Sequence, residues 1–164
     1  KLFKIGDNLA LTTAGLVGHA QSLARTLAAE VSLFELRRGD SMTVRGAATL
    51  TANILSGRPH WVQLLIVGVD SEGGSVYSID SAGGSIPDSY CATGSGSPYM
   101  YGVLEDGFKE NMTRDAAVAL AARALSASAQ RDAASGNGMD LAVITAKDGY
   151  VPVEQSEIAA VLKK

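Results

Sequence analysis

Gly15 stands between an apolar segment and a stretch with helical periodicity, a position where the backbone itself can do chemistry. At the start of a helix the first N–H groups have no partner within the helix, and the helix dipole favours negative charge there. Such N–H groups can stabilise the oxyanion of a tetrahedral intermediate. Gly15 is therefore a candidate oxyanion donor, although the same glycine can simply ease a turn from strand to helix.

Two later segments combine small residues with hydroxyl and carboxylate groups, which donate and accept protons in catalysis. Taken alone, Gly94-Ser95-Gly96-Ser97-Pro98 is interpreted as a loop and Asp132-Ala133-Ala134-Ser135-Gly136 as the end of a helix. Neither segment alone indicates a catalytic site.

Two further motifs are weak. Gly94-x-Gly96 is typical of the start of a dinucleotide fingerprint, but Tyr99 stands where that motif has its third glycine. Cys91, His19 and His60 offer the residue types of a thiol protease, but neither histidine lies in a recognisable signature. Since no spacing is typical of a metal site, the sequence predicts neither a metal nor a cofactor.

The composition predicts one compact domain over residues 1–164. The chain is 46% hydrophobic, which suits a sizeable core. Its 14 basic and 17 acidic side chains give a formal charge of -3, which argues against nucleic acid as a partner. A single cysteine cannot form an internal disulfide, so a cytoplasmic location is expected.

The apolar run from Leu9 to Val17 imitates a secretory signal peptide, because Lys1 and Lys4 precede it. We reject that interpretation, since Asp7-Asn8 interrupts the apolar region and the run continues into an amphipathic pattern. No stretch approaches about 20 uninterrupted apolar residues, so no membrane span is expected.

The first 58 residues are predicted to form a hairpin and two helices. Two short strands, 1–5 and 9–13, would be joined at Gly6-Asp7-Asn8. Apolar residues then recur every three or four positions between residues 16 and 34, which predicts a long helix that ends at Gly39-Asp40. Asp40 or Ser41 is predicted to cap the second helix.

Strands and helices are predicted to alternate in pairs over the rest of the chain. Thr113 is the expected cap of a helix that carries Asp115 in its first turn. Antiparallel hairpins outnumber any β-α-β alternation, which predicts an α+β fold with sheets sandwiched between pairs of helices. The predicted strands are 61–69, 75–79, 139–145 and 150–153, and the predicted helices are 97–108, 113–129 and 154–162.

Five segments of the chain together resemble one family. In order they are KLFKI, TTAGLVGHAQ, WVQLLIVGVDSEGGSVYSIDSAGG, ATGSGSPYMYGVLE and AQRDAASGNGMDLAVITAKDGY. In this order and spacing they resemble β-type subunits of the 20S proteasome, nearest the archaeal kind, over essentially the whole chain. The resemblance implies the N-terminal nucleophile (Ntn) hydrolase fold, a four-layer αββα sandwich of two antiparallel sheets flanked by helices.

The resemblance also implies catalytic roles. Lys1 matches the active-site lysine, whose ammonium lowers the cost of forming an alkoxide. Gly15 matches the glycine whose N–H stabilises the tetrahedral intermediate. Ser95, Asp132 and Ser135 match the polar residues that surround the terminal amine of the nucleophile and hold its geometry.

Thr13 and Val17, on either side of Gly15, match wall positions of the pocket for the substrate side chain just before the scissile bond. Because this wall is moderately apolar, it predicts a preference for hydrophobic or aromatic residues.

The nucleophile of that family is an N-terminal threonine whose own α-amine accepts the proton. Residue 1 here is lysine, and Thr12 and Thr13 lie inside a predicted strand, so neither can supply an α-amine. We therefore expect the 164-residue chain to lack the family's first hairpin, and to be inactive alone. The alternative is a non-catalytic structural ring subunit or an inert fragment of the same family.

The partners that the resemblance implies are those of a self-compartmentalising protease. They are α subunits and other β subunits in stacked heptameric rings, an ATP-dependent unfoldase, and unfolded polypeptide as substrate. The chain itself shows no nucleotide site, so a nucleotide-binding domain that uses the Gly94 loop is the remote third alternative.

Overall fold

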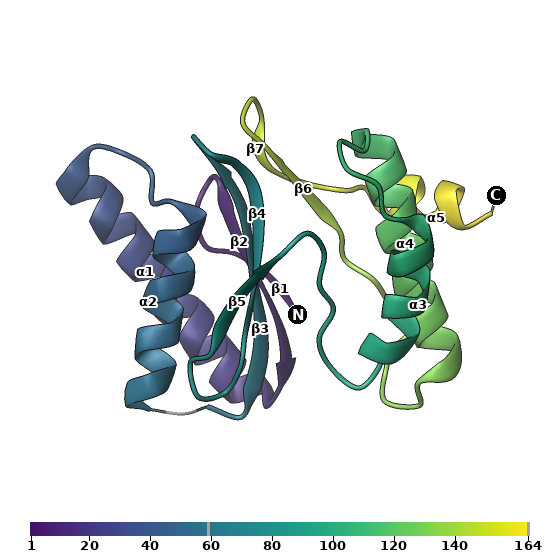
Figure 1. Ribbon diagram of the computed structural model, residues 1–164, viewed down its shortest axis with the longest axis horizontal. Coiled ribbons are helices and arrows are strands. Elements are labelled where there is room, and N and C mark those ends of the chain that lie inside the picture. Colours follow the sequence, from purple (N-terminus) through teal and green to yellow (C-terminus); the bar gives the residue numbers. More distant parts are fainter. Residues whose placement is uncertain (59, 164) are drawn as a thin grey trace. The chain divides into compact units, whose positions relative to one another are not determined.

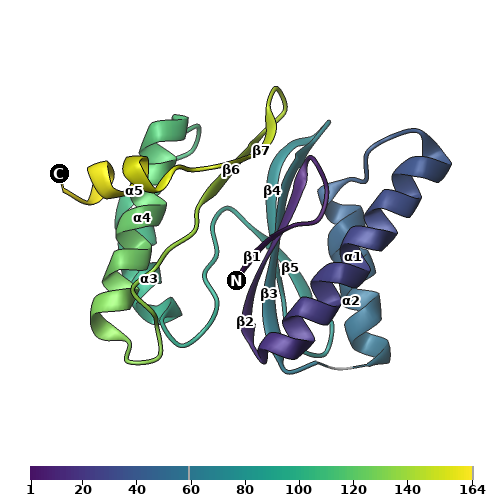
Figure 2. The same ribbon diagram turned by 180° about the vertical axis from the view of Figure 1, so that it is seen from behind.

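The computed structural model describes residues 1–58 and 60–163, and its backbone forms two compact units (Figures 1 and 2). Unit 1 comprises Lys1–Thr93 and Ile144–Tyr150, and unit 2 comprises Gly94–Val143 and Val151–Lys164. The chain therefore passes from unit 2 into unit 1 and back through one hairpin, and each unit is described by itself.

Unit 1 contains a five-stranded sheet in which neighbours in sequence are neighbours in space. Every neighbouring pair is antiparallel, and the connection between β2 and β3 contains both helices of the unit. The strands are β1 (Leu2–Lys4), β2 (Leu9–Gly15), β3 (Val62–Asp70), β4 (Gly73–Ile79) and β5 (Ser85–Asp88).

Helices α1 (Val17–Arg38) and α2 (Val44–Gly57) cover one face of this sheet (Figure 1). Alternate residues of a strand share a face, so Leu9 and Leu11 on β2 point to the same side. Both are fully buried, together with Leu27 of α1 and Leu55 of α2. The core of unit 1 thus lies between the helix pair and the sheet.

The connection between α1 and α2 corrects one prediction. Gly39 ends α1 in the left-handed conformation, at φ 71°, as its position predicted. The cap of α2, however, is Thr43, whose Oγ1 accepts a hydrogen bond from the Gly46 N–H at 3.1 Å. Neither Asp40 nor Ser41 is the cap, and the Asp40 carboxylate instead accepts from the adjacent Ser41 N–H.

Unit 2 is mainly helical: α3 (Ser97–Gly107), α4 (Arg114–Arg131) and α5 (Gln155–Leu162). Val118 of α4, Ile158 of α5 and Val153 form its buried apolar cluster. Strands β6 (Ala142–Thr145) and β7 (Gly149–Pro152) form the hairpin that links the units.

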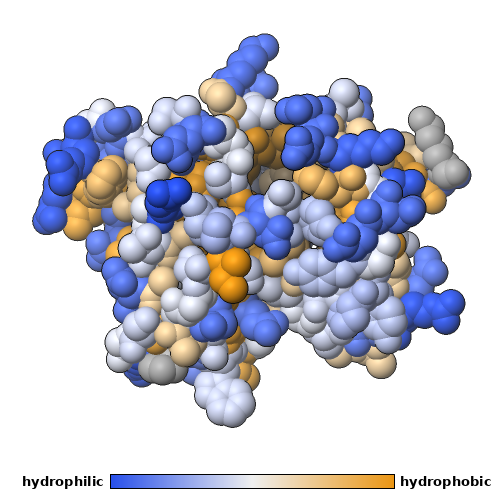
Figure 3. Space-filling model, in the orientation of Figure 1, coloured by the Kyte–Doolittle hydropathy of each residue, from blue (hydrophilic) through white to orange (hydrophobic). Residues whose placement is uncertain are grey.

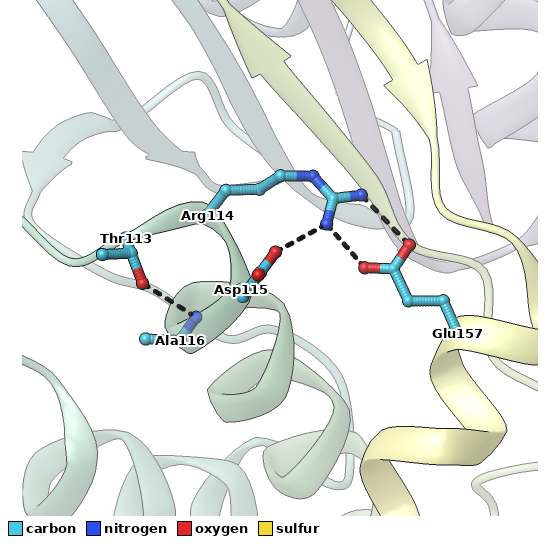
Figure 4. Close-up of polar contacts among 5 residues, drawn as sticks. All are labelled: Thr113, Arg114, Asp115, Ala116 and Glu157. Carbon is cyan, nitrogen blue, oxygen red and sulfur yellow. Dashed lines mark hydrogen bonds and ion pairs between the residues drawn. The ribbon is translucent and has the colours of Figure 1, made fainter.

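The first turn of α4 carries the cap predicted from the sequence, and beside it lies an ion-pair network (Figure 4). Thr113 Oγ1 accepts from the Ala116 N–H at 3.3 Å. Arg114 donates to both carboxylate oxygens of Glu157 on α5, at 2.6 and 3.1 Å, and to Asp115 at 2.9 Å. The hydrogen bonds from Arg114 lower the pKa of the Glu157 carboxyl.

The predicted α+β class and its antiparallel sheets are confirmed. The strand β5 was missed because Ser85-Ile86-Pro87-Asp88 is exposed along its whole length and contains a proline. This segment is a strand because it pairs with β4, and its own residue pattern does not predict a strand.

Several large apolar side chains are exposed, among them Leu36, Trp61 and Ile86. On the face drawn in Figure 3, apolar residues lie in small groups among hydrophilic ones. Within the described residues, no helix is long and apolar enough to cross a membrane.

Candidate functional site

Gly15 ends strand β2 in a conformation that other residue types avoid. Its φ is 111°, and a Cβ built there would lie 2.3 Å from the Trp61 carbonyl oxygen and 3.0 Å from Val62 Cα. The chain therefore requires glycine here both for its backbone angle and for its close approach to β3.

The Gly15 N–H points away from β3. Thr13, two residues earlier, donates its N–H to the Lys1 carbonyl on the β1 side, at 3.0 Å. Because successive N–H groups along a strand point to opposite sides, the N–H of Gly15 points to the same side as that of Thr13. The next N–H, of Leu16, donates to the Trp61 carbonyl at 2.8 Å. The end of β2, here called the Gly15 corner, thus directs the Gly15 N–H toward the β1 side of the sheet.

The other candidate site residues of unit 1 lie near the Gly15 corner. Leu2 pairs with Thr12, which places Lys1 opposite Thr13, and side chains of directly opposed residues share a face. Lys1 is exposed, whereas Thr13 is 8% exposed. Val17 is the first residue of α1 and is 62% exposed. A cation, a backbone donor and two side chains of different polarity therefore lie at one end of β2.

The unit 2 candidates converge on one carboxylate oxygen. Ser95 Oγ donates to Asp132 Oδ2 at 2.6 Å, and Ser135 Oγ donates to the same oxygen at 2.7 Å. The other oxygen, Oδ1, accepts from the Ala134 N–H at 3.2 Å. Both serines singled out in the sequence, Ser95 and Ser135, thus contact the Asp132 carboxylate.

Local structure explains this convergence. Asp132 is the residue at which α4 ends, and the turn after it brings Ser135 back so that its N–H donates to the Asp132 carbonyl at 3.1 Å. Ser95 lies two residues before α3, which packs against α4. The cluster therefore links the N-terminal end of α3 to the C-terminal end of α4.

A fourth hydroxyl, that of Ser128, belongs to this cluster and was missed from the sequence. Its Oγ lies 2.9 Å from Ser135 Oγ, and the residue is 4% exposed. The available signal was spacing, because Ser128 precedes Asp132 by four residues and so lies on the same face of the helix. Apart from this spacing, nothing in the sequence of the alanine-rich helix indicates that Ser128 belongs to the cluster.

The rejected motifs gain no support from the geometry. His19 Nδ1 accepts a hydrogen bond from the Trp61 N–H at 3.1 Å, and its ring contacts that of His60 edge to face. Within residues 1–58 and 60–163, no three His, Cys, Asp or Glu side chains are grouped to hold a metal ion.

Comparisons with known proteins agree on one family. A family model described as "Proteasome subunit" matches residues 1–144. A proteasome subunit beta of Methanobrevibacter ruminantium is 46% identical over 164 residues, which cover 100% of this chain and 79% of that protein. Another, of Thermoplasma acidophilum, is 48% identical over 167 residues, with 100% of this chain and 79% of that protein covered. A third, of Archaeoglobus profundus, is 48% identical over 166 residues, with 99% and 77% covered.

Proposed function

The chain belongs to the proteasome subunit family, and we propose that it is a β subunit that, in its complete form, hydrolyses peptide bonds by threonine chemistry. Proteasome β subunits belong to the threonine peptidases. The observation that carries the proposal is the convergence of two hydroxyl donors on Asp132 Oδ2, at 2.6 and 2.7 Å.

In this proposal a threonine N-terminal to Lys1 supplies the nucleophile. Its hydroxyl oxygen attacks the carbonyl carbon of the scissile bond, and its α-amine takes the hydroxyl proton. The same proton then passes to the leaving nitrogen as the C–N bond breaks. Water, deprotonated by the amine, hydrolyses the ester that remains and regenerates the threonine hydroxyl.

The residues of the chain would assist those steps in different ways. The Lys1 ammonium would stabilise the developing alkoxide, and the Gly15 N–H would donate to the oxyanion. Asp132, held by Ser95 and Ser135, would orient the α-amine, because a carboxylate accepts hydrogen bonds from an ammonium.

The walls of the substrate pocket would include Thr13 and Val17. Thr13 is nearly buried whereas Val17 is exposed at the start of α1, so one closes the pocket and the other borders its opening. This arrangement supports a preference for hydrophobic or aromatic residues before the scissile bond.

The proposed partners are those of a proteasome particle: α subunits, further β subunits, an ATP-dependent unfoldase and unfolded polypeptide. Support comes from the printed names of the relatives, which are proteasome subunits beta. The exposed apolar residues Leu33 and Leu36 on α1 would be covered in such an assembly.

The test compares the complete protein, assembled with its α subunits, with an assembly built on residues 1–164 alone. A fluorogenic peptide that ends in an aromatic residue is the substrate. We expect turnover that a threonine-directed inhibitor abolishes in the complete protein, and none with residues 1–164. Lys1→Ala in the complete protein should reduce kcat on the order of 10²-fold.

Absence of inhibitor-sensitive turnover from the complete, assembled protein would overturn the proposal and favour a structural ring subunit. Turnover by residues 1–164 would also overturn it, because that chain has no threonine at its terminus.

A further inference from the structure

The hydroxyl of Ser128 is the least expected polar group of unit 2, because it is buried inside α4. A buried hydroxyl that lacks a hydrogen bond is costly, so its partner matters. Buried Thr51 on α2 donates to the carbonyl of Ala47, one helical turn back. Ser128 instead contacts a side chain outside its helix, the Ser135 hydroxyl at 2.9 Å.

The direction of this hydrogen bond follows from counting protons. A serine hydroxyl has a single proton, and that of Ser135 is donated to Asp132 Oδ2 at 2.7 Å. Ser135 Oγ must therefore accept from Ser128. The result is a directed chain, from Ser128 to Ser135 to the Asp132 carboxylate, and hydrogen bonds in such a chain strengthen one another.

Packing holds the Ser128 hydroxyl in place. Gly96 lies so close that a Cβ built on it would be 1.8 Å from Ser128 Oγ and 2.9 Å from Ser135 Oγ. Gly96 is buried and follows Ser95, which donates to the same Asp132 oxygen as Ser135. Of the two hydroxyl donors to the carboxylate, Ser135 contacts Ser128 directly, and Ser95 is adjacent in sequence to Gly96, which packs against Ser128.

We propose that Ser128 is a positioning residue, which fixes the Ser135 hydroxyl so that this group holds Asp132 in its catalytic orientation. This inference rests on the proposed function for its kinetic consequence. Ser128 would touch neither the substrate nor the terminal amine and would act through Ser135 alone.

The experiment uses the complete, assembled protein with Ser128→Ala, and Ser126→Ala as the matched control. Both changes remove one oxygen from α4, but the Ser126 hydroxyl accepts from Gln130 and not from the cluster. We expect S128A to lower kcat about fivefold, the factor that one net hydrogen bond represents, with KM changed less than about twofold. Alanine favours helix more than serine, which offsets part of the lost hydrogen bond, so the thermal midpoint of S128A should fall only slightly.

A second measurement does not depend on activity. Crystal structures of both variants should show the Ser135 hydroxyl rotated away from Asp132 in S128A and unmoved in S126A. If the wild-type protein shows no inhibitor-sensitive turnover, the proposed function fails, and the position of the Ser135 hydroxyl still decides the inference about Ser128.

Three results would overturn the inference: wild-type kcat in S128A, an equal loss of kcat in S126A, or a Ser135 hydroxyl that keeps its bond to Asp132 in S128A. A merely structural role for Ser128 would lower the thermal midpoint and leave kcat unchanged.

Discussion

The end of β2 and the cluster around Asp132 are built from different parts of the chain. At Gly15 the proposed functional group is a backbone N–H, whose direction follows from strand alternation and whose residue has a φ of 111°. Around Asp132 the groups are side chains, with two hydroxyls on one carboxylate oxygen and a third hydroxyl behind them.

This difference predicts how each region tolerates change. A backbone donor depends on a conformation that one residue type adopts, so substitution at Gly15 should abolish it in a single step. A side-chain network loses one hydrogen bond at a time, so substitutions in the cluster should give graded effects.

Gly15→Ala should have the largest effect. The added Cβ would lie 2.3 Å from the Trp61 carbonyl oxygen, and alanine is strained at this φ. The end of β2 must shift, so we expect the free energy of unfolding to fall by about 2 kcal/mol or more and kcat on the order of 10²-fold. Denaturant unfolding and steady-state kinetics measure the two losses.

Gly18→Ala, three residues later in α1, is the matched control. A Cβ at Gly18 would have no neighbour within 4 Å, and alanine favours helix, so stability should rise by about 0.5–1 kcal/mol. Equal behaviour of the two variants would show that Gly15 is no more than a flexible link.

Asp132→Asn should have the next largest effect. Asp132 Oδ1 accepts from the Ala134 N–H and Oδ2 accepts from two hydroxyls, so either orientation of an amide would place its NH₂ group against a donor. We expect kcat to fall on the order of 10²-fold with a much smaller change in KM. Asp140→Asn, at an exposed carboxylate of the same unit, should leave both constants unchanged; a wild-type kcat in D132N would remove Asp132 from the proposed mechanism.

Gly96→Ala and Ser128→Ala should couple, because the two positions occupy the same space. The alanine Cβ at position 96 would meet Ser128 Oγ at 1.8 Å, and deleting that oxygen leaves the Ser128 Cβ at 3.0 Å as the closest remaining Ser128 contact. The double variant should therefore be more stable than G96A alone, by about 1 kcal/mol. Additive losses of stability in a denaturant double-mutant cycle would contradict this packing.

The parts of the fold that follow local rules were predictable from the sequence. Thr113 has its helix directly after it and was identified as a cap, whereas Asp40 was misassigned because its side chain satisfies the adjacent N–H. Strand β5 has no pattern of its own, because its place depends on the partner strand β4.

The candidate site could be proposed from the sequence only through the resemblance. Ser95 and Asp132 are 37 positions apart, and no periodicity predicts that their side chains meet at 2.6 Å. Ser128 matched no motif, and its role as a donor follows only from the proton that Ser135 gives to Asp132. Contacts between separate helices require the folded chain.

The ion pair between Arg114 and Glu157 is a polar contact exposed to water. Removing it should have the smallest effect on stability of the substitutions discussed. The side chains are 43% and 34% exposed, in contrast to buried Ser128. Glu157→Gln should lower the thermal midpoint by about 2 °C or less at neutral pH, because exposed ion pairs contribute little. Glu105→Gln, at an exposed glutamate on α3, is the control and should change nothing.

The effect of E157Q should also depend on pH. Arg114 lowers the pKa of the Glu157 carboxyl below its ordinary value of 4.5, so the ion pair stabilises the folded state above that pH. This contribution is lost as the pH falls through the lowered pKa, and the midpoints of wild type and variant should converge there. Thermal unfolding between neutral and acidic pH measures the convergence. If the thermal midpoints of wild type and E157Q still differed in acid, the contact between Arg114 and Glu157 would stabilise the protein by packing and not by charge.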